Sequence, residues 1–111
     1  MTVSKLKDFT KGWIIGDFEP SLYKSKDTEV GVRLYAAGDV EKPHFHKVAT
    51  EFTVIVSGKF KLNDNIYSEG DIITIEPDEI SYFSCLESGK TVVVKIPSVP
   101  GDKYLLNEKD V

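Results

Sequence analysis

The stretch "GDVEKPHFHKVATEFTVIVSG", residues 38–58, contains the two patterns that decide the fold. Its second half includes "EFTVIVS" at 51–57, a run of β-branched and aromatic residues that is typical of a β-strand. Its first half holds both histidines of the chain, His44 and His46. Side chains two positions apart in a strand share one face, so the two imidazoles should point the same way. The stretch therefore predicts β-structure that carries a pair of imidazoles.

Runs of strand type continue on both sides of this stretch at short intervals. "VGVRLYAA" at 30–37 alternates apolar side chains with Gly, Arg and Tyr, the period-two pattern of a half-buried strand. "KFKL" at 59–62 leads into "NDN" at 63–65, and Asn and Asp accept the positive φ of a tight hairpin turn. A turn centred on Gly70 precedes three further runs, at 72–76, 80–86 and 91–96. No segment has the pattern of a helix of useful length, so the chain should be all-β, a sandwich or barrel of antiparallel strands.

Composition limits the partners of this chain. Its 111 residues suffice for one core, and 41% hydrophobic and 29% charged residues are ordinary globular values. With a net charge of −4 and no cluster of lysines, we expect no nucleic-acid partner. Residues 1–12 lack the apolar run of a secretory signal, and no run approaches the ~20 residues that cross a bilayer. We therefore expect a cytoplasmic protein with no membrane partner. Cys85, the only cysteine, excludes an internal disulfide and should be buried in a strand.

A carboxylate completes the candidate chemical group. Glu51 follows the histidine pair and begins the next strand. If that strand pairs antiparallel with the histidine segment, the carboxylate meets the imidazoles across the ladder. Two histidines and one carboxylate leave coordination positions open, as in non-haem iron sites and some zinc and manganese sites. The alternatives are two exposed strand-end histidines or a metal-free polar pocket.

The spacing of these residues resembles a known family pattern. From Gly38 to Gly58 the sequence matches G-x5-H-x-H-x3,4-E-x6-G, the first motif of the cupin superfamily, at every defined position. The core "PHFHKVATE" at 43–51 is particularly similar to the corresponding germin segment. The resemblance implies a small single-domain cupin over residues 1–111, an antiparallel jelly roll or double-stranded β-helix. Its core barrel would span about 28–97, with the flanking N-terminal segment (1–27) and C-terminal tail (98–111) packed on it.

The second cupin motif, G-x5-7-P-x-G-x2-H-x3-N, is present in degraded form. Gly70 and Pro77 match its first two fixed positions. Glu79, Tyr82 and Leu86 stand where the pattern has glycine, histidine and asparagine. The resemblance therefore supports the fold more strongly than it supports a particular activity.

The resemblance implies that His44, His46 and Glu51 hold a divalent metal ion, Fe, Mn, Zn or Ni, although a metal-free site is the open alternative. In metal-binding cupins the position of Tyr82 carries the fourth protein ligand. Ionising a tyrosine at pH 7 costs roughly 4 kcal/mol, so a phenolate ligand is disfavoured. We expect Tyr82 to lie inside the barrel as a hydrogen-bonding wall and candidate catalytic acid or base, with Phe83 on the opposite face.

Three further residues are predicted to bind a small-molecule ligand. Arg33 and Tyr35 share one face of the strand before the histidines, and an inward guanidinium would suit a carboxylate or phosphate. A solvated Arg33 is the alternative. Thr53 shares a face with Glu51 and should line the same cavity. The opposite face of that strand needs cover, which favours a homodimer, and its apolar positions are Phe52, Val54 and Val56.

Three classes of function remain open at this point. The first is a metal-dependent enzyme of the dioxygenase, decarboxylase or isomerase type. The second resembles the cupin isomerases and epimerases of nucleotide-linked sugars, in which a histidine acts as base without a metal. The third is a non-catalytic ligand-binding module, because the fold does not determine the function.

Overall fold

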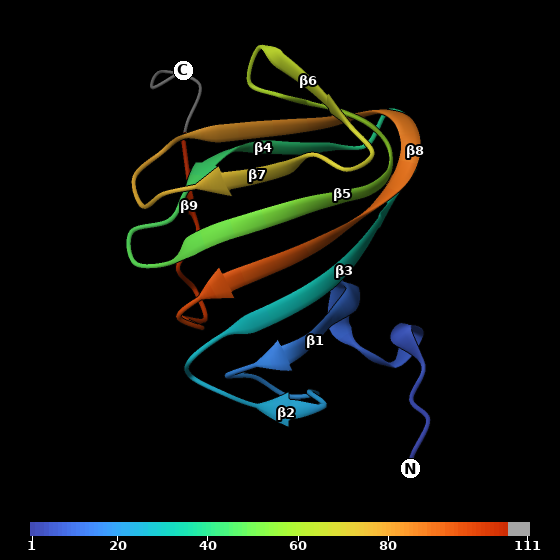
Figure 1. Ribbon diagram of the computed structural model, residues 1–111. Coiled ribbons are helices and arrows are strands. Elements are labelled where there is room, and N and C mark those ends of the chain that lie inside the picture. Colours follow the sequence, from blue (N-terminus) through green and yellow to red (C-terminus); the bar gives the residue numbers. More distant parts are fainter. Residues whose placement is uncertain (107–111) are drawn as a thin grey trace.

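The computed structural model describes residues 1–106, and it is almost entirely β-structure (Figure 1). Helical residues in this part of the chain are confined to two three-residue 3-10 turns, Leu6–Asp8 and Thr10–Gly12. The strands are β1 (Trp13–Gly16), β2 (Tyr23–Lys24), β3 (Glu29–Tyr35), β4 (Val40–Phe45), β5 (Thr50–Leu62), β6 (Asn65–Ser68), β7 (Ile72–Ile75), β8 (Ser81–Ile96) and β9 (Tyr104–Leu105). The expected all-β class is confirmed.

The two longest strands, β5 and β8, organise the barrel. They pair antiparallel over most of their length, and the register shifts between Ile55 and Phe60. Beyond this bend, the first half of β8 pairs with β4, whereas its second half pairs with β3 (Figure 1). Each strand thereby belongs to both layers of the double-stranded β-helix.

Glycine is required where β5 and β8 bend together. Gly58 has a φ of +90°, and a Cβ at this position would lie 2.7 Å from the carbonyl oxygen of Glu87. Opposite it, a Cβ on Gly89 would meet the backbone of Ser57. The last glycine of the first motif therefore allows the close approach of two backbones.

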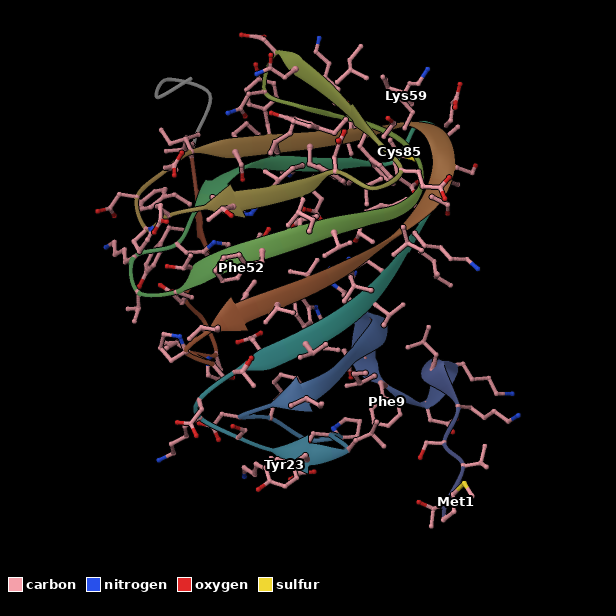
Figure 2. The ribbon with its side chains drawn as sticks, viewed as in Figure 1. Met1, Phe9, Tyr23, Phe52, Lys59 and Cys85 are labelled. Atoms are coloured by element: carbon pink, nitrogen blue, oxygen red, sulfur yellow. The ribbon has the colours of Figure 1, made fainter. Side chains whose placement is uncertain are left out.

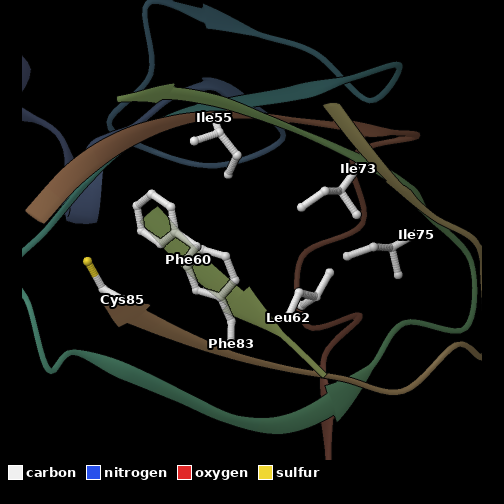
Figure 3. Close-up of a cluster of buried hydrophobic side chains, with 7 residues drawn as sticks. All are labelled: Ile55, Phe60, Leu62, Ile73, Ile75, Phe83 and Cys85. Carbon is white, nitrogen blue, oxygen red and sulfur yellow. The ribbon is translucent and has the colours of Figure 1, made fainter. Parts of the chain in front are cut away.

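The apolar core fills the space between the layers. Phe60 and Phe83 stack with ring centroids 4.9 Å apart, and Tyr35 packs edge-on against Phe60 at 5.4 Å. Figure 3 shows the buried side chains converging from β5, β7 and β8. They are Ile55, Phe60, Leu62, Ile73, Ile75, Phe83 and Cys85. Cys85 is buried as expected, at 2% exposure, and burial raises the pKa of its thiol.

The outer face of β5 follows the predicted alternation. Phe52, drawn in Figure 2, and Val54 lie on the face opposite to buried Thr53 and Ile55. In β8 the cross-strand partners of Phe52 and Val54 are valines, which extends this apolar surface sideways. The homodimer expected from this face stays a prediction.

The terminal segments add strands at the edges. β1 pairs antiparallel with β3, so the N-terminal segment extends one layer. β9 pairs antiparallel with β4 and places the C-terminal segment beside the histidines. Residues 107–111 of the predicted tail lie outside the described residues. Over residues 1–106, no helix has the length and apolar character that crossing a membrane requires.

Candidate functional site

A pocket of about 290 Å³ opens between the two layers of the barrel. Its apolar floor comes from the core, including Leu62, Ile73 and Ile75. Charged and polar side chains cover the rest of its wall. Six of the predicted site residues line it, namely Arg33, Tyr35, His44, His46, Glu51 and Thr53.

The two histidines are buried at the end of β4. His44 is 6% exposed and His46 is 3% exposed, and their ring centroids lie 5.3 Å apart at an interplanar angle of 79°. The Nδ1 atom of His44 lies 2.9 Å from the carbonyl oxygen of Lys42. A carbonyl only accepts, so Nδ1 carries the hydrogen and Nε2 keeps its lone pair. The Nε2 atom of His46 is buried without a hydrogen-bond partner in the described part of the chain.

His46 is electrically neutral at pH 7. Burial lowers the pKa of His46 to about 4, and the charges of Lys95 and His44 act in the same direction. A neutral imidazole with an unused buried nitrogen is a suitable metal ligand. An unpaired buried polar atom is otherwise costly, which makes this atom the most informative one in the pocket.

The loop that carries His46 is fastened by the C-terminal segment. The Asp102 carboxylate accepts hydrogen bonds from the backbone N–H groups of Lys47, Val48 and Ala49 at 2.9 to 3.3 Å. Burial acts to raise the pKa of Asp102, but these donors outweigh it and hold the pKa below its ordinary value. The position of His46 therefore depends on a residue far away in the sequence.

Glu51 reaches the pocket by a different route from the expected one. β5 pairs with β6, β7 and β8, and β4 pairs with β8 and β9, so the predicted ladder between Glu51 and the histidines is wrong. Glu51 instead enters the shared pocket from the other strand set. Its Oε2 atom accepts a hydrogen bond from the Thr53 hydroxyl at 2.9 Å.

The metal-ligand set is only partly assembled. The two imidazoles fit a metal ion, because both line the pocket and neither Nε2 atom is used in a hydrogen bond among residues 1–106. Among residues 1–106, no group of three or more His, Cys, Asp or Glu side chains is arranged to hold an ion. The Thr53 bond uses Oε2 of Glu51, so Oε1 stays available as a third ligand.

Tyr82 lies outside the pocket, which corrects the prediction that it faces the histidines. Its side chain is 40% exposed, and its hydroxyl donates to Asp64 at 3.2 Å. Phe83, expected outside, is buried in the core. The inward position next to the histidines belongs to Ser81, which is 4% exposed and is the Cα partner of His44.

A one-residue shift in the second motif explains this correction. Asp78 has a φ of 70°, a conformation that glycine adopts most easily, so Asp78 takes the place of the motif glycine. The motif histidine lies three positions after that glycine, which is Ser81 and not Tyr82. A hydroxyl therefore stands where metal-binding cupins have their fourth protein ligand.

Arg33 and Tyr35 both face inward. The Tyr35 hydroxyl donates to Glu41 Oε1 at 3.1 Å, and Arg33 Nη2 lies 3.8 Å from the same oxygen. Burial, followed by the charge of Glu41, raises the pKa of Tyr35, so its phenol stays protonated. The solvated alternative for Arg33 is therefore wrong. The Glu41 carboxylate partly balances the charge of the guanidinium.

Sequence reasoning missed several polar and aromatic residues of the pocket wall. The alternation of "TVVVKI" at 91–96 could have indicated Lys95, since it shares parity with buried Val93. Glu41 and Ser81 needed the strand register, and Trp13 carried no local signal. The missed residues are Lys11, Trp13, Glu29, Glu41, Ser81, Phe83, Thr91, Lys95 and Lys103.

No protein-family model and no curated protein matches this chain. Solved structures do match it. KdgF from Halomonas sp. has a TM-score of 0.62 at 20% identity, over 68% of this chain and 74% of that one. A Klebsiella pneumoniae protein with a double-stranded β-helix domain has a TM-score of 0.67 at 21% identity, over 76% and 74%.

A larger protein contains the same fold as a part. Oxalate decarboxylase from Bacillus subtilis, which has Mn(II) centres, matches with a TM-score of 0.64 at 15% identity. The match covers 74% of this chain but 25% of that protein. Likeness at these identities is likeness of fold. The strand topology and these structures together show that the chain is a small domain with the cupin fold.

Proposed function

We propose that this protein binds a small molecule in the barrel pocket together with one divalent metal ion, Fe, Mn, Zn or Ni. His44 and His46 would hold the metal, with Glu51 as the third ligand from the facing wall. The observation that carries the proposal is the buried Nε2 of His46, which has no hydrogen-bond partner among residues 1–106 and lies beside a second available imidazole. Removing both nitrogens from water without a ligand would be unfavourable.

The bound metal would polarise an oxygen atom of the ligand or activate water. The chain itself performs the other tasks. Tyr35 and Arg33 hold Glu41 at the wall, and Thr53 orients Glu51 through its Oε2 atom, which leaves Oε1 for the metal. Ser81 offers a hydroxyl at the place of a fourth ligand, so that coordination position stays open to the small molecule.

The test is the metal content of purified protein. Wild-type protein should carry about one transition-metal ion per chain, and His46→Ala and His44→Ala should each lose most of it. Tyr82→Phe is the matched control, because Tyr82 points away from the pocket. Equal metal content in wild type and His46→Ala would contradict the proposal.

A metal-free binding module or enzyme is the second candidate. Two observations favour it: Ser81 replaces the motif histidine, and the described residues contain no assembled three-ligand group. The pocket volume of about 290 Å³ is at the lower limit for small-molecule sites, which favours a ligand smaller than a nucleotide-linked sugar. Ligand binding that survives exhaustive chelation would decide for this candidate.

A further inference from the structure

Lys95 brings a positive charge into the pocket from the middle of the sheet. On β8 its Cα partners are Glu29 in β3 and Glu51 in β5, and all three residues line the pocket. Direct cross-strand neighbours of opposite charge commonly form ion pairs. Yet none of the ion pairs within residues 1–106 includes Lys95. Its ammonium group lies instead 4.9 Å from the centre of the Trp13 ring.

The neighbouring carboxylates already have other partners. Glu29 accepts a hydrogen bond from the buried Ser98 hydroxyl at 3.2 Å. Glu51 accepts one from Thr53 at 2.9 Å, and Glu41 accepts one from Tyr35 at 3.1 Å. The described side chains give Lys95 no hydrogen-bond acceptor of its own. The pocket thus contains a cation that forms no ion pair with the neighbouring carboxylates, each of which accepts a hydrogen bond from a neutral hydroxyl.

Trp13 holds two cations at one wall of the pocket. Trp13 pairs with Gly31, and a Cβ on that glycine would lie 2.7 Å from the indole, so the ring packs directly on β3. The Arg33 guanidinium lies 5.8 Å from the centre of the same ring. Cations are attracted to the face of an indole at such distances. Both cations therefore lie near the same indole ring, which neutralises neither charge.

Lys95 also lies near the histidine pair. Its charge contributes, after burial, to the lowered pKa of His46. A ligand group beside Lys95 would thus be within the same small pocket as the two imidazoles. The Lys95 ammonium forms no ion pair with the described residues, so it can bind one negative charge of a ligand. Lys11 and Lys103 line the same pocket, and Arg33 keeps part of its charge engaged by Glu41 at 3.8 Å.

We propose that Lys95, Arg33 and Trp13 form an anion subsite, and that the natural ligand is a small organic acid whose carboxylate binds Lys95 while its other end faces His44 and His46. This inference rests on the proposed function of the pocket as a small-molecule site. It adds the ligand's chemical class and the residue that selects it. A neutral molecule of the same size would leave Lys95 without an acceptor.

Trp13 is the only tryptophan, so its fluorescence reports on this subsite directly. We expect a saturable fluorescence change when wild-type protein is titrated with malonate at low ionic strength, and none with malonamide. Lys95→Met should weaken malonate binding about tenfold to a hundredfold, whereas Lys95→Arg should restore most of it. Lys90→Met is the matched control on the same strand, because Lys90 is exposed and does not line the pocket.

Three results would overturn the inference. They are equal binding of malonate and malonamide, unchanged malonate binding in Lys95→Met, and the absence of any saturable response to malonate. A stronger response to inorganic phosphate than to malonate would overturn the assignment to a carboxylate. Metal content measured on the same samples keeps the two proposals apart. If His46→Ala loses metal but still binds malonate, the result supports the anion subsite. If Lys95→Met keeps normal metal content, the metal proposal is unaffected by the outcome of the malonate titration.

Discussion

The two motif regions of this barrel differ in how closely they follow the family pattern. In the first region, His44, His46 and Glu51 all line one pocket, as their spacing predicts. In the second region the turn at Gly70 forms, with a φ of 91°, but the inward residue is Ser81 where Tyr82 was expected. Because side chains alternate along a strand, a shift of one residue exchanges the two faces.

The cause of the shift lies at one turn before β8. The N–H group of Asp78 donates to the carbonyl oxygen of His46 at 2.7 Å, and Asp78 adopts a φ of 70°. The second motif is therefore attached to the first at this turn. The positive φ of Asp78, more than the motif proline Pro77, therefore sets which residues of β8 face the pocket.

The largest expected effect is on the free energy of unfolding, and it distinguishes buried Phe83 from its exposed neighbour Tyr82. Phe83→Ala removes a ring stacked on Phe60 in the core and should reduce the free energy of unfolding by about 3–5 kcal/mol. Tyr82→Ala removes an exposed side chain and should reduce it by less than about 1 kcal/mol. Urea denaturation of the two variants measures both values. A larger loss of unfolding free energy in Tyr82→Ala than in Phe83→Ala would support the original motif alignment, in which Tyr82 faces inward.

The second prediction concerns the pH dependence of the first region. His46 has a pKa of about 4 when folded and an ordinary value of 6.5. Below pH 6.5 the unfolded chain takes up a proton that the folded chain refuses, so the free energy of unfolding falls as the pH drops from 6.5 to 4. The total loss should reach up to about 3 kcal/mol.

Urea denaturation in metal-free buffer at several pH values measures this slope. His46→Gln should be nearly insensitive to pH over the same window. Asp102 does not interfere, because its pKa is held below its ordinary value of 3.8 and its contribution is lost only at lower pH. A wild-type slope as flat as that of the variant would show that His46 is protonated in the folded state.

The smallest expected effect is on metal affinity, and it tests which residue of β8 faces the histidines. Ser81→His would return an imidazole to the position opposite His44 and should raise metal affinity at least about tenfold. Tyr82→His should leave affinity unchanged, because that side chain is directed to Asp64 and water. Titration with Mn(II) or Zn(II) compares the two variants. Stronger binding in Tyr82→His than in Ser81→His would contradict the one-residue shift.

Local pattern was sufficient for much of this protein. The alternation in 51–57 predicted a strand with the correct inward face, including Thr53. The alternation in 30–37 predicted a strand but left open whether Arg33 and Tyr35 face inward, and only the tertiary structure places them at the pocket. The spacing of Gly38 to Gly58 identified the fold. Gly58 is where the two long strands approach most closely, so its position in the motif has a packing reason.

Other features depended on segments that are distant in the sequence. Glu51 and the histidines share a pocket although their strands do not pair. Asp102, more than fifty positions away, fastens the loop that carries His46. No local pattern contains these contacts, because each depends on where the chain returns after several turns.

The amino-acid sequence by itself determined the β class, the cupin first motif and the shared face of His44 and His46, since these depend on alternation and spacing within short stretches. Only the tertiary structure decided that Ser81 faces the pocket and that Lys95 forms no ion pair among residues 1–106. The first depends on the φ of Asp78, held by a hydrogen bond from another motif. The position of Lys95 depends on the contacts of its neighbours Glu51 and Glu29, which accept hydrogen bonds from Thr53 and Ser98. These contacts form only when the strands come together.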